Sequence, residues 1–215
     1  MVRVVILDLD GTLVDTNYLH VEAWARAFRT VGCQVPRSAI HHQIGKGSDQ
    51  MLPEFIADEA LARRADELHG AIYAELAQHS YPLPGARELL AALKARGVAL
   101  WLGTSAKPDE LERQLGALEA QDKLAGIISS EDVERSKPAG DIFAITLERA
   151  GCAPTEAVAI GDTIWDVIAA QKAGLRSVAV LTGGAFCAAE LQAAGAVAVY
   201  ADCAALLAAG FPEGL

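Results

Sequence analysis

Short continuous apolar runs recur along the chain and alternate with segments of helical spacing. The first run, Val4-Val5-Ile6-Leu7, is followed by others at residues 98–103, 127–128, 158–161 and 177–181. Strands that are apolar on both faces are typical of a parallel sheet covered by helices on both sides. The runs therefore predict the strands of one parallel sheet.

The segments between the runs predict helices that end at glycines. Residues 86–93 carry apolar side chains at positions i, i+3, i+4 and i+7, and the pattern stops at Gly97, a residue type that readily forms a left-handed helix cap. Residues 142–147 and 164–168 repeat this pattern, each before a glycine. The alternation predicts an α/β fold, an open parallel sheet in a three-layer sandwich with a Rossmann-like core.

Residues 15–83 do not follow this alternation. They contain helical stretches at residues 19–31 and 61–77 but no convincing buried strand, and Pro82-Leu83-Pro84-Gly85 marks their end. We interpret this segment as a helical cap that is inserted after the first strand and faces the strand ends. The predicted units are a core of residues 1–14 and 84–215 and a cap of residues 15–83.

Composition limits the class of partner. With 215 residues, 22.6 kDa and 52% hydrophobic residues, the chain can bury a full core. Its formal net charge of -10 and its pI near 4.9 disfavour binding to nucleic acid or to an anionic membrane, because both reward a basic surface. We expect no nucleic-acid or membrane partner, and a monomer with a dimer as the alternative.

The cysteines and the first residues bear on location. Cys33, Cys152, Cys187 and Cys203 are far apart in the sequence and form no Cys-x-x-Cys pair, so free thiols in a reducing compartment are the simplest interpretation. The first strand begins at Val4, and its apolar run is too short for a signal sequence or a membrane span. We therefore expect a cytoplasmic protein.

The first run delivers two carboxylates, Asp8 and Asp10, into a turn at Gly11. In an extended chain both side chains lie on one face, and carboxylates that close repel each other unless a cation or a shared proton joins them. A calcium loop would need further oxygen ligands at alternate positions and a closing Glu, whereas Thr12 and Val14 follow here. Two solvated acids at a strand end are the remaining structural alternative.

Further polar residues follow other predicted strands, where parallel sheets collect reactive groups. Thr104 and Ser105 follow the run at 98–103, Lys137 lies in a Ser-Lys-Pro loop, and Asp162 and Asp166 follow the run at 158–161. Carboxylates suit Mg²⁺, which prefers hard oxygen ligands. A phosphate that approaches three carboxylates would need that cation, the charge of Lys137 and a hydroxyl donor such as Thr104. The set predicts phosphoryl transfer, with Lys137 and Thr104 among the catalytic residues.

Each of these residues also has a structural alternative. Lys137 could be an exposed loop lysine, and Thr104 could cap the next helix. Asp162 and Asp166 could be acids in a first helical turn that complement the helix dipole. These alternatives treat the residues one at a time, whereas the order of the motifs along the chain favours a common site.

The chain resembles the haloacid dehalogenase superfamily in four ordered motifs, Asp8-x-Asp10, Thr104, Lys137 and Asp162. Within it, the similarity is to the phosphatase branch with a small helical cap, which includes phosphoglycolate phosphatases and relatives of β-phosphoglucomutase. The resemblance implies a Mg²⁺-dependent phosphatase that hydrolyses a small soluble phosphate monoester through an aspartyl-phosphate intermediate. Dehalogenases of this superfamily lack the carboxylate of Asp10 and need no metal, so Asp10 favours phosphate chemistry.

The resemblance also implies a role for each acid. Asp8 is expected to be the nucleophile and a metal ligand, and Asp10 the general acid and base, with its backbone carbonyl on the metal. Asp162 is expected to be the second carboxylate ligand, and Asp166 to hold Lys137 or a metal-bound water. Because Asp10 must gain and lose a proton, we expect its pKa to lie well above that of Asp8.

Candidate substrate-binding residues lie in the cap and beside the second run. The mutases of this superfamily carry a Thr and a His where Thr16 and His20 fall, so the resemblance implies that His20 responds to cap closure. Lys46 lies in a glycine-flanked turn that could reach a substrate anion. Trp24 is a further cap residue near the expected site, whereas the pair His41-His42 is expected on the cap surface. The candidate substrate-binding residues are Thr16, His20, Lys46, Ser105 and Lys107.

Two other functions compete with hydrolysis. A sugar phosphomutase must hold a second phosphate, but Asp49 lies where mutases carry an arginine, and Gly161 precedes the metal Asp where they carry Glu. A non-catalytic phospho-receiver would use Asp8 but has no need for an inserted cap or for an acid at Asp10. Hydrolysis of a small phosphorylated metabolite is therefore the preferred prediction.

Overall fold

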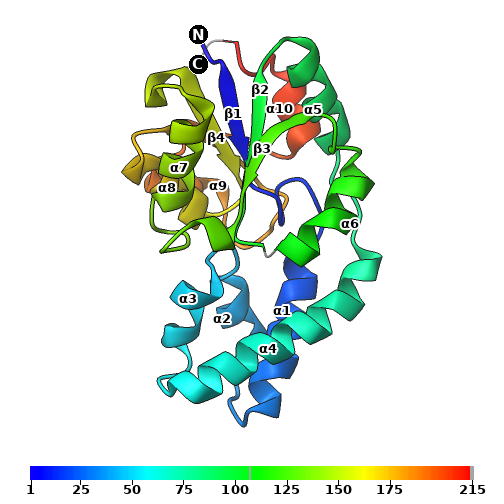
Figure 1. The fold of residues 1–215 in the computed structure, drawn as a ribbon, viewed down its shortest axis with the longest axis vertical. Helices are drawn as coiled ribbons and strands as arrows, with labels where there is room; N and C mark the ends of the chain where they lie inside the picture. Colours follow the sequence, from blue (N-terminus) through cyan, green and yellow to red (C-terminus); the bar gives the residue numbers. More distant parts are fainter. Residues whose placement is uncertain (107, 214–215) are drawn as a thin grey trace.

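The computed structural model describes residues 1–106 and 108–213, and a six-stranded sheet forms its centre (Figure 1). The strand order is β3-β2-β1-β4-β5-β6, with every pairing parallel. The strands are β1 Val4–Leu7, β2 Ala99–Gly103, β3 Leu124–Ile128, β4 Ala157–Gly161, β5 Arg176–Val180 and β6 Ala198–Tyr200. The parallel α/β fold predicted from the apolar runs is confirmed.

Helices cover both faces of the sheet. One face carries α5 Ala86–Ala95, α6 Pro108–Leu118 and α10 Cys203–Ala208. The other carries α7 Asp141–Ala150, α8 Ile164–Lys172 and α9 Ala188–Ala194. Short 3₁₀ turns lie at Ser130–Asp132 and Pro154–Glu156.

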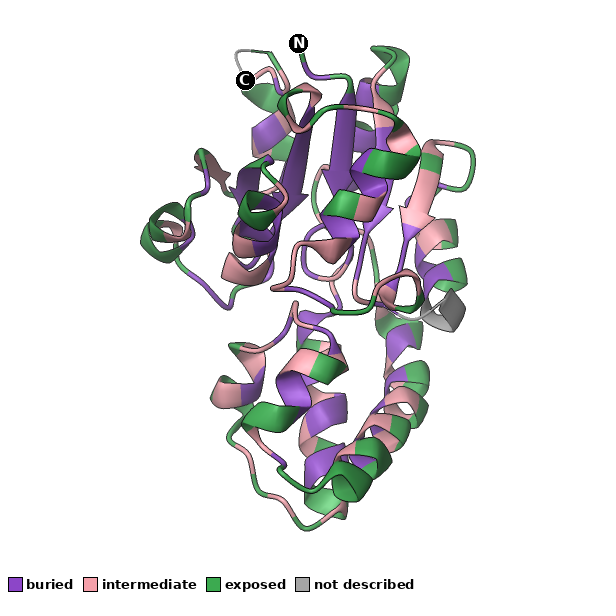
Figure 2. Cartoon of the chain, turned by 60° about the vertical axis from the view of Figure 1, so that its left-hand side comes forward, coloured by how far each residue is buried: buried purple, intermediate pink, exposed green. Residues whose placement is uncertain are grey.

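The central strands β1, β2 and β4 are apolar along their whole length because helices cover both faces of the sheet there. In β1, Val5 and Leu7 pack in one core cluster with side chains of α5 and α10, while Val4 and Ile6 pack in a second cluster with side chains of α7 and α8. Figure 2 shows the central strands as buried and the outer turns of the helices as exposed. The core therefore lies in two apolar layers, one on each side of the sheet.

Four helices between β1 and α5 form a layer of their own beyond the carboxyl ends of the strands (Figure 1). They are α1 Asn17–Thr30, α2 Arg37–His41, α3 Ser48–Met51 and α4 Glu59–Leu76, with 3₁₀ turns at Leu52–Glu54 and Ala77–His79. Trp24, Phe28, Ile40 and Met51 belong to a hydrophobic cluster made by this layer alone. The helical layer thus has a core separate from those of the sheet.

Two chain segments join this layer to the sheet, and they lie side by side. The N–H of Asp15 donates to the carbonyl of Tyr81 at 2.9 Å, and the N–H of Leu83 donates to the carbonyl of Leu13 at 2.9 Å. Paired connections of this kind let a layer rotate as a unit about its hinge. We therefore propose the division into a core of residues 1–14 and 84–215 and a cap of residues 15–83.

The sequence analysis did not identify α6, α9, α10 or β6. β6 has three half-buried residues at the edge of the sheet, and α9 and α10 are short and rich in alanine, so their patterns carry little signal. Among the described helices, none combines the length and the apolarity needed to cross a lipid bilayer.

Candidate active site

Asp8 and Asp10 follow β1 directly. The N–H of Asp8 continues the sheet ladder by donating to a carbonyl of β4 at 2.8 Å, and Leu9 between the two acids is fully buried. Gly11 then turns the chain with φ of 77°, and a β-carbon there would lie 2.6 Å from Asp162 Oδ2. Only glycine fits this turn, which brings the first loop against the Asp162 carboxylate.

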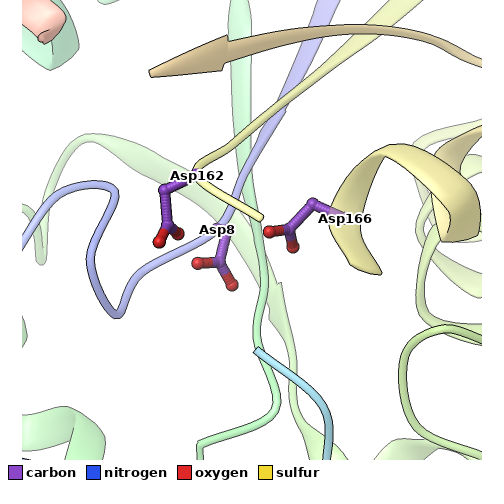
Figure 3. Close-up of side chains that lie close together, drawn as sticks. All are labelled: Asp8, Asp162 and Asp166. Atoms are coloured by element: carbon purple, nitrogen blue, oxygen red, sulfur yellow. The ribbon is translucent and has the colours of Figure 1, made fainter. Parts of the chain in front are cut away.

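Three carboxylates from distant parts of the chain meet at this edge of the sheet (Figure 3). Asp8 follows β1, Asp162 follows β4, and Asp166 lies in the first turn of α8. An oxygen atom of each lies within 4.8 Å of the others, and the three residues are at most 4% exposed. The fold therefore gathers these acids into one buried cluster.

Lys137 places its ammonium group between two of these carboxylates. Its Nζ lies 2.5 Å from Asp8 Oδ1 and 2.8 Å from Asp166 Oδ1, and the side chain is fully buried. The other oxygen of Asp166 accepts from Thr163 Oγ1 at 2.5 Å and from Thr163 N at 3.1 Å, in a capping box that begins α8. The alternative that Lys137 is an exposed loop lysine is therefore wrong.

Two neutral side chains that the sequence analysis did not single out hold Asp162. Thr12 Oγ1 donates to Asp162 Oδ1 at 2.9 Å and lies 3.3 Å from Asp8 Oδ2, and Asn17 Nδ2 donates to Asp162 Oδ2 at 3.0 Å. Thr12 directly follows the Asp-x-Asp-Gly turn, so its place in the motif could have indicated it. Asn17 carried no such signal, because it begins α1 and meets Asp162 only in the folded chain.

The surroundings of the cluster shift the pKa values of its members. Burial raises the pKa of Asp8 to about 7; Lys137 opposes this shift, and Asp166 and Asp10 add to it. Burial, Asp166 and Asp8 likewise raise the pKa of Asp162 well above its ordinary value. Burial alone would lower the pKa of Lys137, but the two neighbouring carboxylates raise it. The cluster therefore favours added positive charge.

These residues fit a hard divalent cation. Three ionised carboxylates against the ammonium of Lys137 leave two negative charges uncompensated, which is costly in a buried site. The donors are all oxygens, the ligands that Mg²⁺ prefers over nitrogen and sulfur. The donor set therefore agrees with the Mg²⁺ site that the motifs imply.

Asp10 is held by groups outside this cluster. Its Oδ1 accepts from Thr16 Oγ1 at 2.6 Å and from Gln114 Nε2 at 3.3 Å, and it lies 3.4 Å from His20 Nε2. Burial would raise the pKa of Asp10, but His20 and Thr16 lower it below its ordinary value. We expected this pKa to lie above that of Asp8, and for the metal-free protein that expectation is wrong. Asp8 lies among carboxylates, whereas Asp10 has an imidazole beside it.

Thr104 and Ser105 lie where β2 ends. Thr104 is fully buried, and its Oγ1 accepts from the N–H of Ala106 at 3.0 Å, which leaves the hydroxyl hydrogen for another acceptor. Ser105 Oγ lies 3.5 Å from the carbonyl of Gly45 in the cap. Lys107 falls outside the described residues.

A pocket of about 70 Å³ lies between the acids and the cap. Its lining includes Asp8, Asp10 and Ser105 from the core, and His20, Trp24, Lys46, Ser48 and His69 from the cap. The Lys46 side chain is 7% exposed; its Nζ lies 3.2 Å from Glu54 Oε1 and 4.3 Å from the ring centre of Trp165. Lys46 thus reaches the pocket while already engaged with an acid and an aromatic ring.

The glycines on either side of Lys46 let the cap approach the core. A β-carbon on Gly45 would lie 2.8 Å from Thr163 Oγ1, and one on Gly47 would lie 2.3 Å from Ser136 Oγ. Thr163 and Ser136 are the neighbours of Asp162 and Lys137 in the sequence. Side chains at these two cap positions would therefore push the cap away from the loops that carry the cluster.

The pair His41-His42 lies on the part of the cap surface that faces the core, where His42 is exposed, as expected, and His41 is half-buried. His41 Nε2 lies 3.0 Å from the carbonyl of Gly183, and Trp165 Nε1 donates to the carbonyl of His42 at 3.0 Å. The end of α2 meets the loop after β5 and the first turn of α8 here, a contact between distant segments that residue type alone does not indicate.

The raised pKa of Asp8 predicts an unusual pH dependence of stability for the metal-free protein. With a folded pKa of about 7 and an ordinary value of 3.8, the folded state binds this proton more tightly than the unfolded state. We expect Asp8 to make the free energy of unfolding fall between about pH 4 and pH 7, by up to about 1.4 kcal/mol per pH unit. Urea unfolding in EDTA across this range measures the slope. The slope should shrink in Asp8→Asn, and equal slopes in both proteins would contradict the assignment.

Comparisons of sequence and structure with known proteins identify what this chain is similar to. The family model described as haloacid dehalogenase-like hydrolase matches residues 5–180. Validoxylamine A 7'-phosphate phosphatase of Streptomyces hygroscopicus subsp. limoneus is 31% identical over 186 residues, covering 85% of this chain and 87% of that protein. Phosphoglycolate phosphatase of Pseudomonas putida is 32% identical over 195 residues, covering 84% and 70%. The crystal structure of a hydrolase from Pseudomonas syringae shares 34% identity, with a TM-score of 0.90 over 96% of both chains.

The matched residues run from β1 through β5 and include Asp8, Lys137 and Asp166. The relatives named as phosphatases, together with the shared fold, confirm the prediction of a phosphoric monoester hydrolase of this type. The chain belongs to the haloacid dehalogenase-like hydrolase family.

Proposed function

We propose that the protein is a Mg²⁺-dependent phosphatase that hydrolyses a small phosphate monoester through phosphorylated Asp8. The observation that carries this proposal is the buried cluster of Asp8, Asp162 and Asp166, with Lys137 between two of its members. A dianionic phosphate cannot approach three carboxylates without added positive charge, and phosphoryl transfer depends mostly on positioning and charge. With a divalent cation bound, the cluster has the composition that this reaction needs.

Asp8 is the proposed nucleophile. Its carboxylate attacks phosphorus to form an acyl phosphate as the bond to the leaving oxygen breaks, and water then attacks phosphorus and restores the carboxylate. The ammonium of Lys137, 2.5 Å from Asp8 Oδ1, supports charge on the phosphoryl oxygens. Thr104 contributes a hydroxyl hydrogen bond to one of them.

Asp10 is the proposed general acid and base. It donates a proton to the leaving alkoxide and later removes one from the attacking water. Its carboxylate lines the pocket, and Thr16 and Gln114 hold its Oδ1. This arrangement restrains the carboxylate in one orientation for both steps.

The carboxylates of Asp8 and Asp162, with the backbone carbonyl of Asp10, are the proposed Mg²⁺ ligands, and Asp166 is proposed to hold Lys137 beside them. When bound, the cation supplies the positive charge that admits a phosphate dianion and stabilises the transition state. Thr12 fixes the orientation of Asp162 through its hydroxyl group.

The proposed cap limits the substrate to a small metabolite. The pocket of about 70 Å³ is bounded by both layers, and contacts such as Trp165 to His42 hold the layers together around it. A site closed in this way excludes macromolecular phosphoesters and shields the reaction from bulk water. The two sequence relatives are named for small phosphorylated compounds, and we propose a substrate of the same size class, in the cytoplasm.

Two features disfavour a sugar phosphomutase. A β-carbon on Gly161 would lie 2.4 Å from the β-carbon of Asp166, so the Glu that mutases carry there does not fit this backbone. Asp49, where mutases carry an arginine, accepts from the N–H of Ser136 at 3.2 Å and places negative charge beside the loop of Lys137. Neither position supports a second phosphate.

A phosphate-release screen tests the proposal. Over sugar phosphates, phosphoglycolate and nucleotides, we expect Mg²⁺-dependent release from a subset of the small monoesters, and a loss of at least about 100-fold in EDTA. Faster isomer formation than phosphate release, after priming with a bisphosphate, would instead identify a mutase. Stable phosphorylation of Asp8 without turnover would identify a receiver.

A further inference from the structure

Gln114 connects the core, the cap and Asp10. It lies in α6 and is 1% exposed, and its Nε2 donates to Tyr73 Oη at 2.7 Å and to Asp10 Oδ1 at 3.3 Å. Tyr73 belongs to α4 in the cap and is also 1% exposed. A carboxamide nitrogen carries two hydrogens, so both bonds can form at once.

Tyr73 also contacts the group that reaches Asp10 from α1. Its ring stacks on the His20 ring with centroids 3.8 Å apart and planes 10° apart. His20 Nε2 in turn lies 3.4 Å from the Asp10 oxygen that Gln114 binds. Tyr73 therefore contacts both the α1 side chain and the α6 side chain that converge on this carboxylate.

Polar contacts link α4 to α6 around Tyr73, next to an open cleft. A cleft of about 500 Å³ lies against Tyr73, with Gly70 on the α4 side and Glu112 and Gly116 on the α6 side. Arg113 Nη1 donates to the carbonyl of Ala74 at 3.4 Å across the same two helices. The Arg113 bond is exposed and can exchange with bonds to solvent, whereas the Gln114–Tyr73 bond is buried and would break only if α4 moved away from α6.

We propose that Gln114 is a positioning residue that aligns the Asp10 carboxylate only while Tyr73 of the closed cap is docked on it. With the cap closed, Tyr73 orients the carboxamide, and the second N–H of that group fixes Asp10 Oδ1. When the cap rotates away, Tyr73 leaves with α4, the carboxamide loses its orienting partner, and Asp10 is released. Acid and base chemistry is thereby restricted to the closed pocket. This inference rests on the proposed function, specifically on Asp10 as the acid and base.

Two conservative variants test the link. Gln114→Met removes the carboxamide but keeps an unbranched side chain, and Tyr73→Phe removes the hydroxyl but keeps the ring on His20. Each is expected to lower kcat for p-nitrophenyl phosphate about 10- to 100-fold with little change in KM, because Asp10 is misaligned while substrate contacts remain. The double variant should be no slower than Gln114→Met, because both substitutions remove the same link.

Rapid mixing distinguishes misalignment of Asp10 from general damage. The nitrophenolate group leaves without protonation, so phosphorylation of Asp8 should stay fast while hydrolysis of the phosphorylated protein slows. Both single variants should therefore show a burst of nitrophenolate before slow turnover. A uniform fall in both phases would overturn the proposal.

Arg113→Met is the matched control, because it breaks another bond between α4 and α6 without touching Asp10. It should keep wild-type kcat and show no new burst. Wild-type kcat in Gln114→Met and Tyr73→Phe, or an equal loss in Arg113→Met, would overturn the proposal. Asp10→Asn distinguishes a failure of the positioning role of Gln114 from a failure of the acid and base role of Asp10. If it is inactive while Gln114→Met is unimpaired, only the positioning role fails; if it is fully active, the acid and base role fails.

Discussion

Asp8→Asn is expected to lower kcat for p-nitrophenyl phosphate by at least about 10,000-fold, because a carboxamide cannot act as the nucleophile toward phosphorus. The substitution keeps the size of the side chain and an oxygen that can accept from Lys137, so the fold should persist. Steady-state kinetics measure the loss, and mass spectrometry after acid quenching detects the phosphorylated protein. The wild-type protein should carry the phosphoryl group during turnover, and the variant should not.

Asp141→Asn is the control for this substitution. The substitution is chemically the same, but Asp141 lies at the start of α7, away from the buried cluster. Its carboxylate pairs with Arg135 at 3.2 Å on the surface. It should retain wild-type turnover. Activity of Asp8→Asn within about tenfold of wild type would exclude Asp8 as the nucleophile.

Asp162→Asn is expected to abolish the stabilisation that Mg²⁺ gives to the fold and to lower turnover by about 1,000-fold or more. A ligand that binds only the folded state at 100 times its Kd adds about 2.7 kcal/mol to the free energy of unfolding. The variant lacks one of three carboxylates and should show little of this gain. Chemical unfolding with and without Mg²⁺, together with calorimetric titration of Mg²⁺, measures binding independently of catalysis.

In EDTA the same variant should be at least as stable as the wild-type protein. The pKa of Asp162 is raised by burial and by the charges of Asp166 and Asp8, so removing its charge relieves repulsion in the metal-free cluster. Asp141→Asn should keep the full Mg²⁺ effect. An undiminished Mg²⁺ effect in Asp162→Asn would contradict the ligand assignment, and lower stability in EDTA would show that the bonds from Thr12 and Asn17 outweigh the repulsion.

Several contacts between the cap and the candidate site make the chemistry depend on the position of the cap. Asn17 of α1 donates to Asp162, Thr16 and His20 approach Asp10, and the turn at Lys46 lies against the loops beside the cluster. A rotation of the cap would therefore change the surroundings of both acids at once. Under the proposed function, substrate entry and catalytic alignment are two consequences of one motion.

The sequence by itself determined strands β1 to β5 of the sheet and the residues of the buried cluster. A strand that is buried on both faces has a continuous apolar sequence, which can be recognised directly. Parallel strands place the residues that follow them at one edge of the sheet, so Asp8, Lys137 and Asp162 could be expected together. These inferences need only local pattern and the general geometry of a parallel sheet. They succeeded where the position of a residue directly after a strand is enough to place it in the site.

The tertiary structure decided what depends on the docking of distant segments. Asn17, Gln114 and Tyr73 carry no local signal, because each acquires its partner only when α1, α4 and α6 meet around the first loop. The order of the Asp8 and Asp10 pKa values was likewise out of reach, since two acids in one motif differ only through burial and through the charges packed beside them. A side chain's identity is local, but its electrostatic environment is assembled from the whole fold.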